Sequence, residues 1–129
     1  TLVNGLKIKN YKMTYSKKLK ITFTDKQWER IRKMKSVKMK FELTNSEDDD
    51  FYEYRTVGKN SRIHRIDGPA YRDTFRTSWH VDGKLHREDG PAQIWIGSLP
   101  SKEYWLCGKH LTKHQFDCIT AKRRLKKII

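Results

Sequence analysis

The sequence predicts an α+β fold: an antiparallel β-sheet, or meander, of β-hairpin repeats with two short basic helices. Three observations predict it. Apolar residues alternate with polar ones near the start of the chain, a pattern of about 25 residues recurs in its middle, and two segments begin with helix-capping residues. The 129 residues fit one compact domain. We divide it into a basic strand–helix–strand segment (1–50), two and a half hairpin repeats (51–111) and a basic C-terminal helix (112–129).

The first segment combines strand patterns with one helix. Residues 2–23 alternate between apolar and polar side chains, which is typical of strands with one solvent-facing side. Thr24, followed three residues later by Gln27, forms a capping box, because each side chain can bind an amide that the first helical turn leaves without a partner. A helix is therefore expected to begin there. The alternation returns at 37–43, which predicts a further strand.

The middle of the chain repeats itself with a period of 25 residues. An aromatic residue stands four positions before a Gly-Lys pair three times, and the string His-Arg-x-Asp-Gly-Pro-Ala occurs twice. Asp82-Gly83 lies between two short apolar runs and predicts a tight hairpin turn, because Gly tolerates a positive φ. Each repeat is expected to be a strand–turn–strand unit that stacks on its neighbour and buries aromatic rings. The residues that define the repeat are Tyr54, Gly58, His64, Asp67, Gly68, Pro69, Trp79, Gly83, His86, Asp89, Gly90, Pro91, Tyr104 and Gly108.

The two Asp-Gly-Pro strings predict a second kind of turn. In it, Asp binds downstream amides, Gly supplies a left-handed conformation and Pro stops strand pairing. The preceding His and Arg are expected to bond the turn carboxylate or nearby backbone. A nuclease is the minor alternative, with His64 and His86 as the acid–base pair beside Asp67 and Asp89. We favour the structural role, because equivalent side chains of stacked hairpins need not converge on one cleft.

The string Gly-Lys-Leu-His-Arg-Glu-Asp-Gly-Pro-Ala, with an aromatic residue before it, resembles the MORN-like repeats of phage and bacterial proteins. The resemblance covers about residues 52–116, half of the chain. It implies an array of β-hairpins and a phage setting, and it implies no catalytic residues. The matching residues are Trp79, Gly83, Lys84, His86, Arg87, Asp89, Gly90, Pro91 and Ala92, and in the closing half-repeat Gly108, Lys109, Leu111, Thr112 and Phe116.

The end of the chain predicts a second helix, and it contains one weak metal-binding pattern. Thr112 and Gln115 form another capping box, after which apolar residues recur at helical spacing. Four soft ligands lie within twelve residues, although their spacing is tighter than in common zinc modules. We favour the alternative of a buried Cys118 and surface histidines, without a cofactor. The weak candidate ligands are Cys107, His110, His114 and Cys118.

Charge is the strongest compositional feature, with a formal net value of +14. Residues 1–50 hold 13 basic and 7 acidic groups, 51–106 hold 9 and 7, and 107–129 hold 7 and 1. Two basic ends therefore flank a nearly neutral middle, and we expect both ends to lie on a common side. Such a field attracts nucleic acid, anionic lipid or an acidic protein surface.

The sequence shows no apolar stretch near the roughly 18 residues of a membrane helix and no secretory pattern. Two cysteines are too few for a disulfide scaffold. We therefore expect a soluble protein without a membrane partner, acting in the cytoplasm of an infected bacterium if the resemblance to phage proteins holds.

The leading functional hypothesis is a non-enzymatic, phage-type accessory protein that binds nucleic acid or a ribonucleoprotein through backbone phosphates. The alternative is an inhibitor or adaptor that binds an acidic host protein. No cofactor is expected. The candidate phosphate-binding residues are Lys17, Lys18, Lys20, Arg30, Arg32, Lys33, Lys35, Lys38, Lys40, Arg123, Arg124, Lys126 and Lys127.

Overall fold

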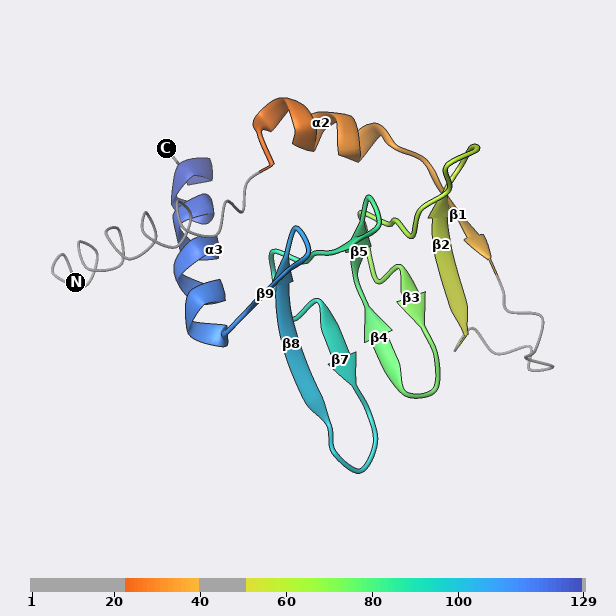
Figure 1. The fold of residues 1–129 in the computed structure, drawn as a ribbon. Coiled ribbons are helices and arrows are strands. Elements are labelled where there is room, and N and C mark those ends of the chain that lie inside the picture. Colours follow the sequence, from red (N-terminus) through yellow and green to blue (C-terminus); the bar gives the residue numbers. More distant parts are fainter. Residues whose placement is uncertain (1–22, 40–50, 129) are drawn as a thin grey trace, which may run out of the picture.

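A computed structural model describes residues 23–39 and 51–128. Seven strands form one antiparallel sheet in the order β1-β2-β3-β4-β7-β8-β9, and β5 pairs with β6 alone (Figure 1). The predicted α+β fold is confirmed. The elements are α2 (Asp25–Lys33), β1 (Ser36–Met39), β2 (Tyr52–Thr56), β3 (Tyr71–Arg72), β4 (Arg76–Ser78), β5 (His80–Val81), β6 (Lys84–Leu85), β7 (Gln93–Trp95), β8 (Ser101–Leu106), β9 (Lys109–Leu111) and α3 (Lys113–Ile128).

Both helices begin where their capping boxes predict. The Gln27 amide donates to Thr24 Oγ1 at 3.2 Å, and the Thr24 amide donates to Gln27 Oε1 at 2.9 Å. Thr112 and Gln115 make the same reciprocal pair at 3.1 and 2.9 Å. These bonds supply acceptors to amides that have no carbonyl partner within the helix. Neither helix in the described ranges is long and apolar enough to cross a bilayer.

The main hydrophobic cluster lies where α3 packs on β8 and β9. Leu106 and Leu111 come from the strands, and Phe116 and Ile119 come from the first turns of the helix. All four are buried, and Tyr104 packs against them with its ring 4.9 Å from that of Phe116. The apolar side of α3 therefore closes one end of the sheet. In Figure 1, α2 instead crosses the upper ends of the strands.

The sequence repeat corresponds to a repeated pattern of backbone hydrogen bonds. The Tyr54 amide donates to the Ala70 carbonyl at 2.7 Å, and the Trp79 amide donates to Ala92 at the same distance. Within each unit, the aromatic residue thus pairs with the Ala that ends the His-Arg-x-Asp-Gly-Pro-Ala string. Each copy forms the hairpin that its period predicts.

The predicted tight turns are present in the second and third copies. Asp82 (φ 52°) and Gly83 (φ 80°) connect β5 to β6, and Cys107 (φ 51°) and Gly108 (φ 79°) connect β8 to β9. Two successive residues with positive φ match the twist of paired strands, which explains the recurrent glycine.

The histidine of each repeat caps the turn of the next repeat. The Asp82 amide donates to His64 Nδ1 and the Cys107 amide donates to His86 Nδ1, both at 2.9 Å. Both rings are buried. A buried amide without an acceptor is destabilising. Each histidine ring supplies the acceptor that the amide of the next turn does not find within its own hairpin.

The two ends of this stack use other groups in place of the histidine. At the first turn, the Val57 amide donates to the Lys35 carbonyl at 3.3 Å, so the segment after α2 supplies the acceptor. In the last copy, Leu111 takes the position of the histidine and packs beside Phe116. The next element is α3 instead of another hairpin, and an apolar side chain packed under this helix suits the position better than a ring that would need a hydrogen-bond partner.

One expectation for the Asp-Gly-Pro turns is wrong. Gly68 and Gly90 are not among the glycines with positive φ. Space is the reason for glycine here, since a Cβ at Gly68 would lie 2.9 Å from Arg65 Cζ, and one at Gly90 would lie 3.0 Å from Arg87 Cζ. The absent side chain leaves room for the guanidinium to lie against the turn.

Replacing the first capping histidine tests this account. His64→Leu places an apolar side chain at the same position but leaves the Asp82 amide without its hydrogen-bond acceptor. We expect the free energy of unfolding, measured by urea denaturation, to fall by about 1–3 kcal/mol. The matched change His110→Leu, at an exposed ring, should have little effect. Equal losses in the two variants would contradict the capping role.

Candidate nucleic-acid interface

The repeat turns stack along the upper end of the sheet and carry cations. Arg62 lies over Gly83 and Lys84 lies over Gly108, where an added Cβ would be 3.5 and 3.6 Å from the respective side chain. Arg62 and Lys84 stand in equivalent places, because each precedes by two residues the histidine that caps the next turn. We call the exposed cations of this row the turn rim: Lys35, Lys59, Arg62, Lys84 and Lys109.

A basic pocket of about 500 Å³ lies at the first turn. Three members of the turn rim line it, and no carboxylate is among the described residues that do so. Arg62 also pairs with the Asp82 carboxylate of the next turn, which fixes its guanidinium in place. The pocket can accept an anionic group. Its lining residues are Met34, Lys35, Thr56, Val57, Gly58, Lys59, Asn60 and Arg62.

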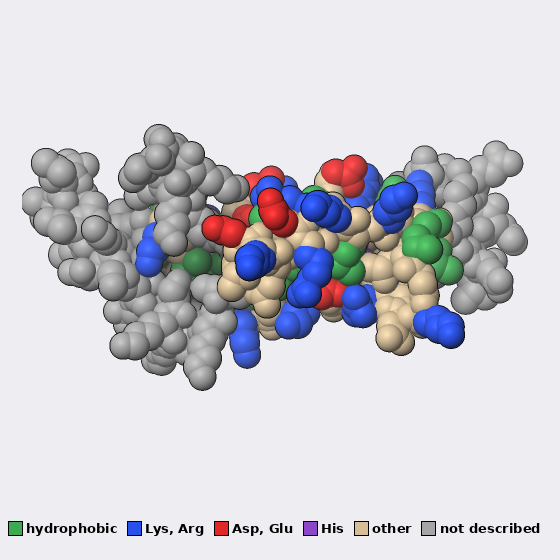
Figure 2. All heavy atoms as spheres, turned by 90° about the horizontal axis from the view of Figure 1, so that it is seen from above, with side chains coloured by type: hydrophobic (Ala, Val, Ile, Leu, Met, Phe, Trp, Pro, Cys, Tyr) green, Lys and Arg blue, Asp and Glu red, His purple; other side chains and the backbone are tan. Residues whose placement is uncertain are grey.

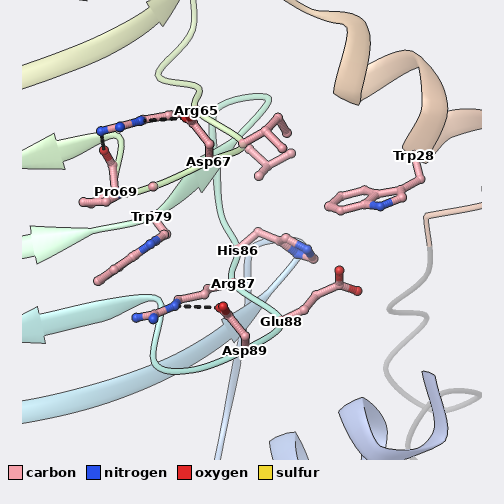
Figure 3. Close-up of a pocket in the computed structure, with 12 residues that line it drawn as sticks. Trp28, Arg65, Asp67, Pro69, Trp79, His86, Arg87, Glu88 and Asp89 are labelled. Atoms are coloured by element: carbon pink, nitrogen blue, oxygen red, sulfur yellow. Dashed lines mark hydrogen bonds and ion pairs between the residues drawn. The ribbon is translucent and has the colours of Figure 1, made fainter. Parts of the chain in front are cut away.

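A second, open pocket of about 570 Å³ lies between α2 and the two Asp-Gly-Pro turns (Figure 3). Arg65 Nε donates to Asp67 and Arg87 Nε donates to Asp89, both at 2.9 Å. Figure 3 shows Trp28 of α2 across the pocket from these pairs. The pocket is lined by Trp28, Arg65, Ile66, Asp67, Gly68, Pro69, Trp79, Val81, His86, Arg87, Glu88 and Asp89.

The two arginines of the second pocket are used within their own repeats. Arg87 lies over the Trp79 ring at 3.9 Å, and its Nη1 donates to the Pro91 carbonyl at 3.1 Å. Arg65 repeats this arrangement on Tyr54 at 4.2 Å. Each guanidinium therefore joins the aromatic residue, the Asp and the Pro carbonyl of one repeat.

Exposed charge in the second pocket is negative. The Asp67 and Asp89 side chains are 85% and 86% exposed, whereas the arginines that bind them are largely covered. The hydrogen bond from Arg65 holds the pKa of Asp67 below its ordinary value, so this carboxylate stays ionised. This pocket is unsuited to a phosphate, and the basic pocket at the first turn is the better anion site.

Several residues of the nuclease alternative lie together in the structure, but both of its histidines are hydrogen-bonded to turn amides. Both Arg–Asp pairs and His86 line one pocket. His64 is not among the residues that line it. In both histidines, Nδ1 accepts a hydrogen bond from a backbone amide of the next turn. This nitrogen is therefore not available as a proton acceptor in catalysis.

The structure does not bring the four weak zinc candidates together into one site. No group of three or more metal-ligating side chains occurs in the part of the chain that the structure describes. His114 and Cys118 lie one turn apart on α3, with Nε2 and Sγ separated by 3.9 Å. Cys107 and His110 belong to the β8–β9 hairpin, where the His110 ring stacks on Trp105 at 4.7 Å. Strand and helix thus hold the two pairs apart.

The predicted phosphate-binding residues fall into three groups. Arg30, Lys33 and Lys35 are exposed on or just after α2. Arg32 lies over Trp28 at 5.1 Å, and Lys38 lies over Tyr52 at 5.0 Å, so both have aromatic partners. Figure 2 looks down on this end of the molecule and shows basic side chains along it, with acidic ones grouped in a few places. Outside the described residues, or with undescribed side chains, are Lys17, Lys18, Lys20, Lys40, Arg123, Arg124, Lys126 and Lys127.

The expectation that both basic ends lie on a common side stays a prediction, because residues 1–22 and the side chains of residues 123–129 lie outside what the structure describes. β1, which contains Lys38, forms one edge of the sheet, whereas α3 packs on β8 and β9 near the other edge. The strand order separates them, and no local pattern in the sequence specifies that order.

Sequence reasoning missed most of the turn rim. Lys59, Lys84, Arg62 and Lys109 were not among the predicted phosphate ligands. The signal was nevertheless present, because the Gly-Lys pairs recur every 25 residues and stacked turns must place their lysines in one row. Neither protein-family models, nor curated proteins, nor solved structures give a match to this chain. The likeness to MORN-like repeats therefore depends on the motif residues alone.

Acid should destabilise the protein through His80. Its Nε2 lies 2.9 Å from Ser78 Oγ, and burial, reinforced by the Arg76 charge, lowers its pKa from 6.5 to about 4. Between these values the unfolded chain binds the proton and the folded chain does not. The free energy of unfolding should therefore fall as the pH drops from 6.5 to about 4, by up to about 3 kcal/mol.

Urea denaturation of the native protein and His80→Gln across this pH range measures that effect. The variant should lack the His80 contribution and show a shallower pH dependence. Identical slopes for the two proteins would contradict the assignment.

Proposed function

We propose that this protein is a non-enzymatic accessory protein that binds nucleic acid, free or in a ribonucleoprotein, through backbone phosphates at the turn rim. The observation that carries the proposal is the basic pocket at the first turn, continued by Lys84 and Lys109 on the following turns. Lysine and arginine side chains on such a surface neutralise phosphates and release counterions.

The turn rim has a regular spacing. Successive turns are two strands apart, which corresponds to roughly 10 Å in a sheet. The histidine caps connect each turn to the next, so the cations stand on a rigid support. A row of this kind fits a repeating line of negative charges better than a single small anion.

The environment of the aromatic rings favours contact with phosphates over contact with bases. Trp79 lies under Arg87 at 3.9 Å, and Trp95 lies under Arg76 at 5.4 Å. Faces covered in this way are already used by cations of the chain, whereas stacking on bases needs an open ring face. Backbone contacts position a protein on nucleic acid without reading its sequence, so we expect weak sequence preference.

Salt dependence tests the proposal directly. The logarithm of the association constant for duplex DNA should fall linearly with the logarithm of salt concentration, with a slope of about −0.9 per phosphate neutralised. Fluorescence anisotropy with labelled duplexes measures it. Lys59→Ala, Lys84→Ala and Lys109→Ala should each weaken binding and make the slope shallower by about 0.9 for every phosphate that the variant no longer neutralises.

Lys102→Ala is the matched control, because Lys102 is an exposed lysine of β8 outside the turn rim. It should leave the slope unchanged. A salt-insensitive affinity, or an equal loss of affinity in the control, would contradict the proposal. The alternative, an acidic host protein as partner, would be favoured if a partner protein stays bound to the affinity-purified chain after nuclease treatment.

A further inference from the structure

The β3–β4 and β7–β8 loops lie at the lower end of the sheet, away from α2 (Figure 1). The β3–β4 loop contains Phe75, and the β7–β8 loop contains Ile96 and Leu99. The Ile96 amide donates to the Phe75 carbonyl at 2.7 Å, so the loops lie side by side. These side chains, which we call the apolar tip, are 65%, 55% and 88% exposed. Exposed apolar side chains that gather on neighbouring loops commonly mark an interaction surface.

The β3–β4 loop is held in a defined conformation. Asp73 Oδ1 accepts the amides of Phe75 and Arg76, each at 2.8 Å, and Oδ2 accepts the Tyr71 hydroxyl at 2.7 Å. One carboxylate therefore fixes both sides of the loop while Phe75 stays exposed. The Phe75 ring is therefore exposed on a turn whose backbone is held in one conformation.

Two cationic side chains lie on the strands that flank the loops of the apolar tip. Residues directly opposite each other on antiparallel strands share a face of the sheet, and the pairs Arg72–Thr77, Thr77–Ile94 and Ile94–Lys102 form one row across four strands. Arg72 and Lys102 end this row, and both are exposed.

We propose that the apolar tip attaches the protein to an anionic lipid surface. Phe75, Ile96 and Leu99 would enter the boundary between head groups and acyl chains, while Arg72 and Lys102 contact lipid phosphates. Apolar side chains beside cations are the combination that binds such interfaces. The sequence contains no membrane-spanning pattern and for that reason predicts no membrane partner, but peripheral attachment does not require a spanning segment.

The charge of the chain favours lipid over a second copy, because two molecules of net charge +14 repel each other. A protruding pair of loops also enters a lipid interface without the complementary pocket that a protein partner would need. The turn rim lies at the opposite ends of the strands, so attachment here leaves it accessible (Figure 1).

Co-sedimentation with vesicles tests the proposal on the full chain. The native protein should bind vesicles of phosphatidylcholine and phosphatidylglycerol, and bind phosphatidylcholine alone far more weakly. The double variant Phe75→Ser/Leu99→Ser should bind the anionic vesicles at least tenfold more weakly. Val37→Ser is the matched control, because Val37 is 53% exposed on β1, outside both the apolar tip and the basic pocket, and it should bind as the native protein does.

A fluorescence measurement separates insertion from simple charge attraction. Emission of Phe75→Trp should shift to the blue on adding anionic vesicles, whereas Val37→Trp should not add to the shift of the native tryptophans. Circular dichroism and unchanged duplex binding would show that the variants fold. Equal vesicle binding by native and double-variant protein, or no binding by either, would overturn the proposal and leave the turn rim untouched.

Discussion

The hydrogen bond from a turn amide to the histidine of the preceding repeat is the contact on which the stack depends. A two-residue turn with positive φ directs an amide out of its own hairpin, and burial makes an external acceptor necessary. Neutral imidazole supplies it, and burial lowers the pKa of His64, which favours the neutral form. The same requirement explains both ends: a backbone carbonyl after α2 serves the first turn, and Leu111 replaces the histidine where α3 follows in place of another hairpin.

Arginine and lysine have different uses in this protein, although both contribute to the same net charge. Arg65 and Arg87 stack on aromatic rings and bind carboxylates within their repeats, so their charge is largely balanced locally. The lysines that follow the turn glycines are exposed. A planar guanidinium suits several directed bonds at once, whereas a flexible ammonium keeps its charge in solvent. The composition alone therefore overstates how much positive charge the middle of the chain offers to a partner.

The two ends of the sheet, at which the strands are connected, differ in the chemistry of their exposed side chains. Cations on stacked turns occupy the upper end beside α2, and exposed apolar side chains occupy the lower end. Both features arise from loops between strands, which can vary without disturbing the pairing that holds them. The acidic pocket between α2 and the Asp-Gly-Pro turns has the opposite sign from the turn rim. These surfaces differ in chemistry and position, so they suit different partners.

The sequence by itself determined the elements that depend on near neighbours. Capping boxes between residues three positions apart set the helix starts, and Asp82-Gly83 set a hairpin turn, because these signals act over a few residues of backbone. Only the tertiary structure decided which distant residues meet. The histidine caps join positions 18 and 21 residues apart, Phe75 and Ile96 come from separate hairpins, and the strand order carries β1 and α3 to opposite edges. Such contacts form because burial and hydrogen bonding across the whole sheet favour one arrangement, and no local pattern encodes that balance.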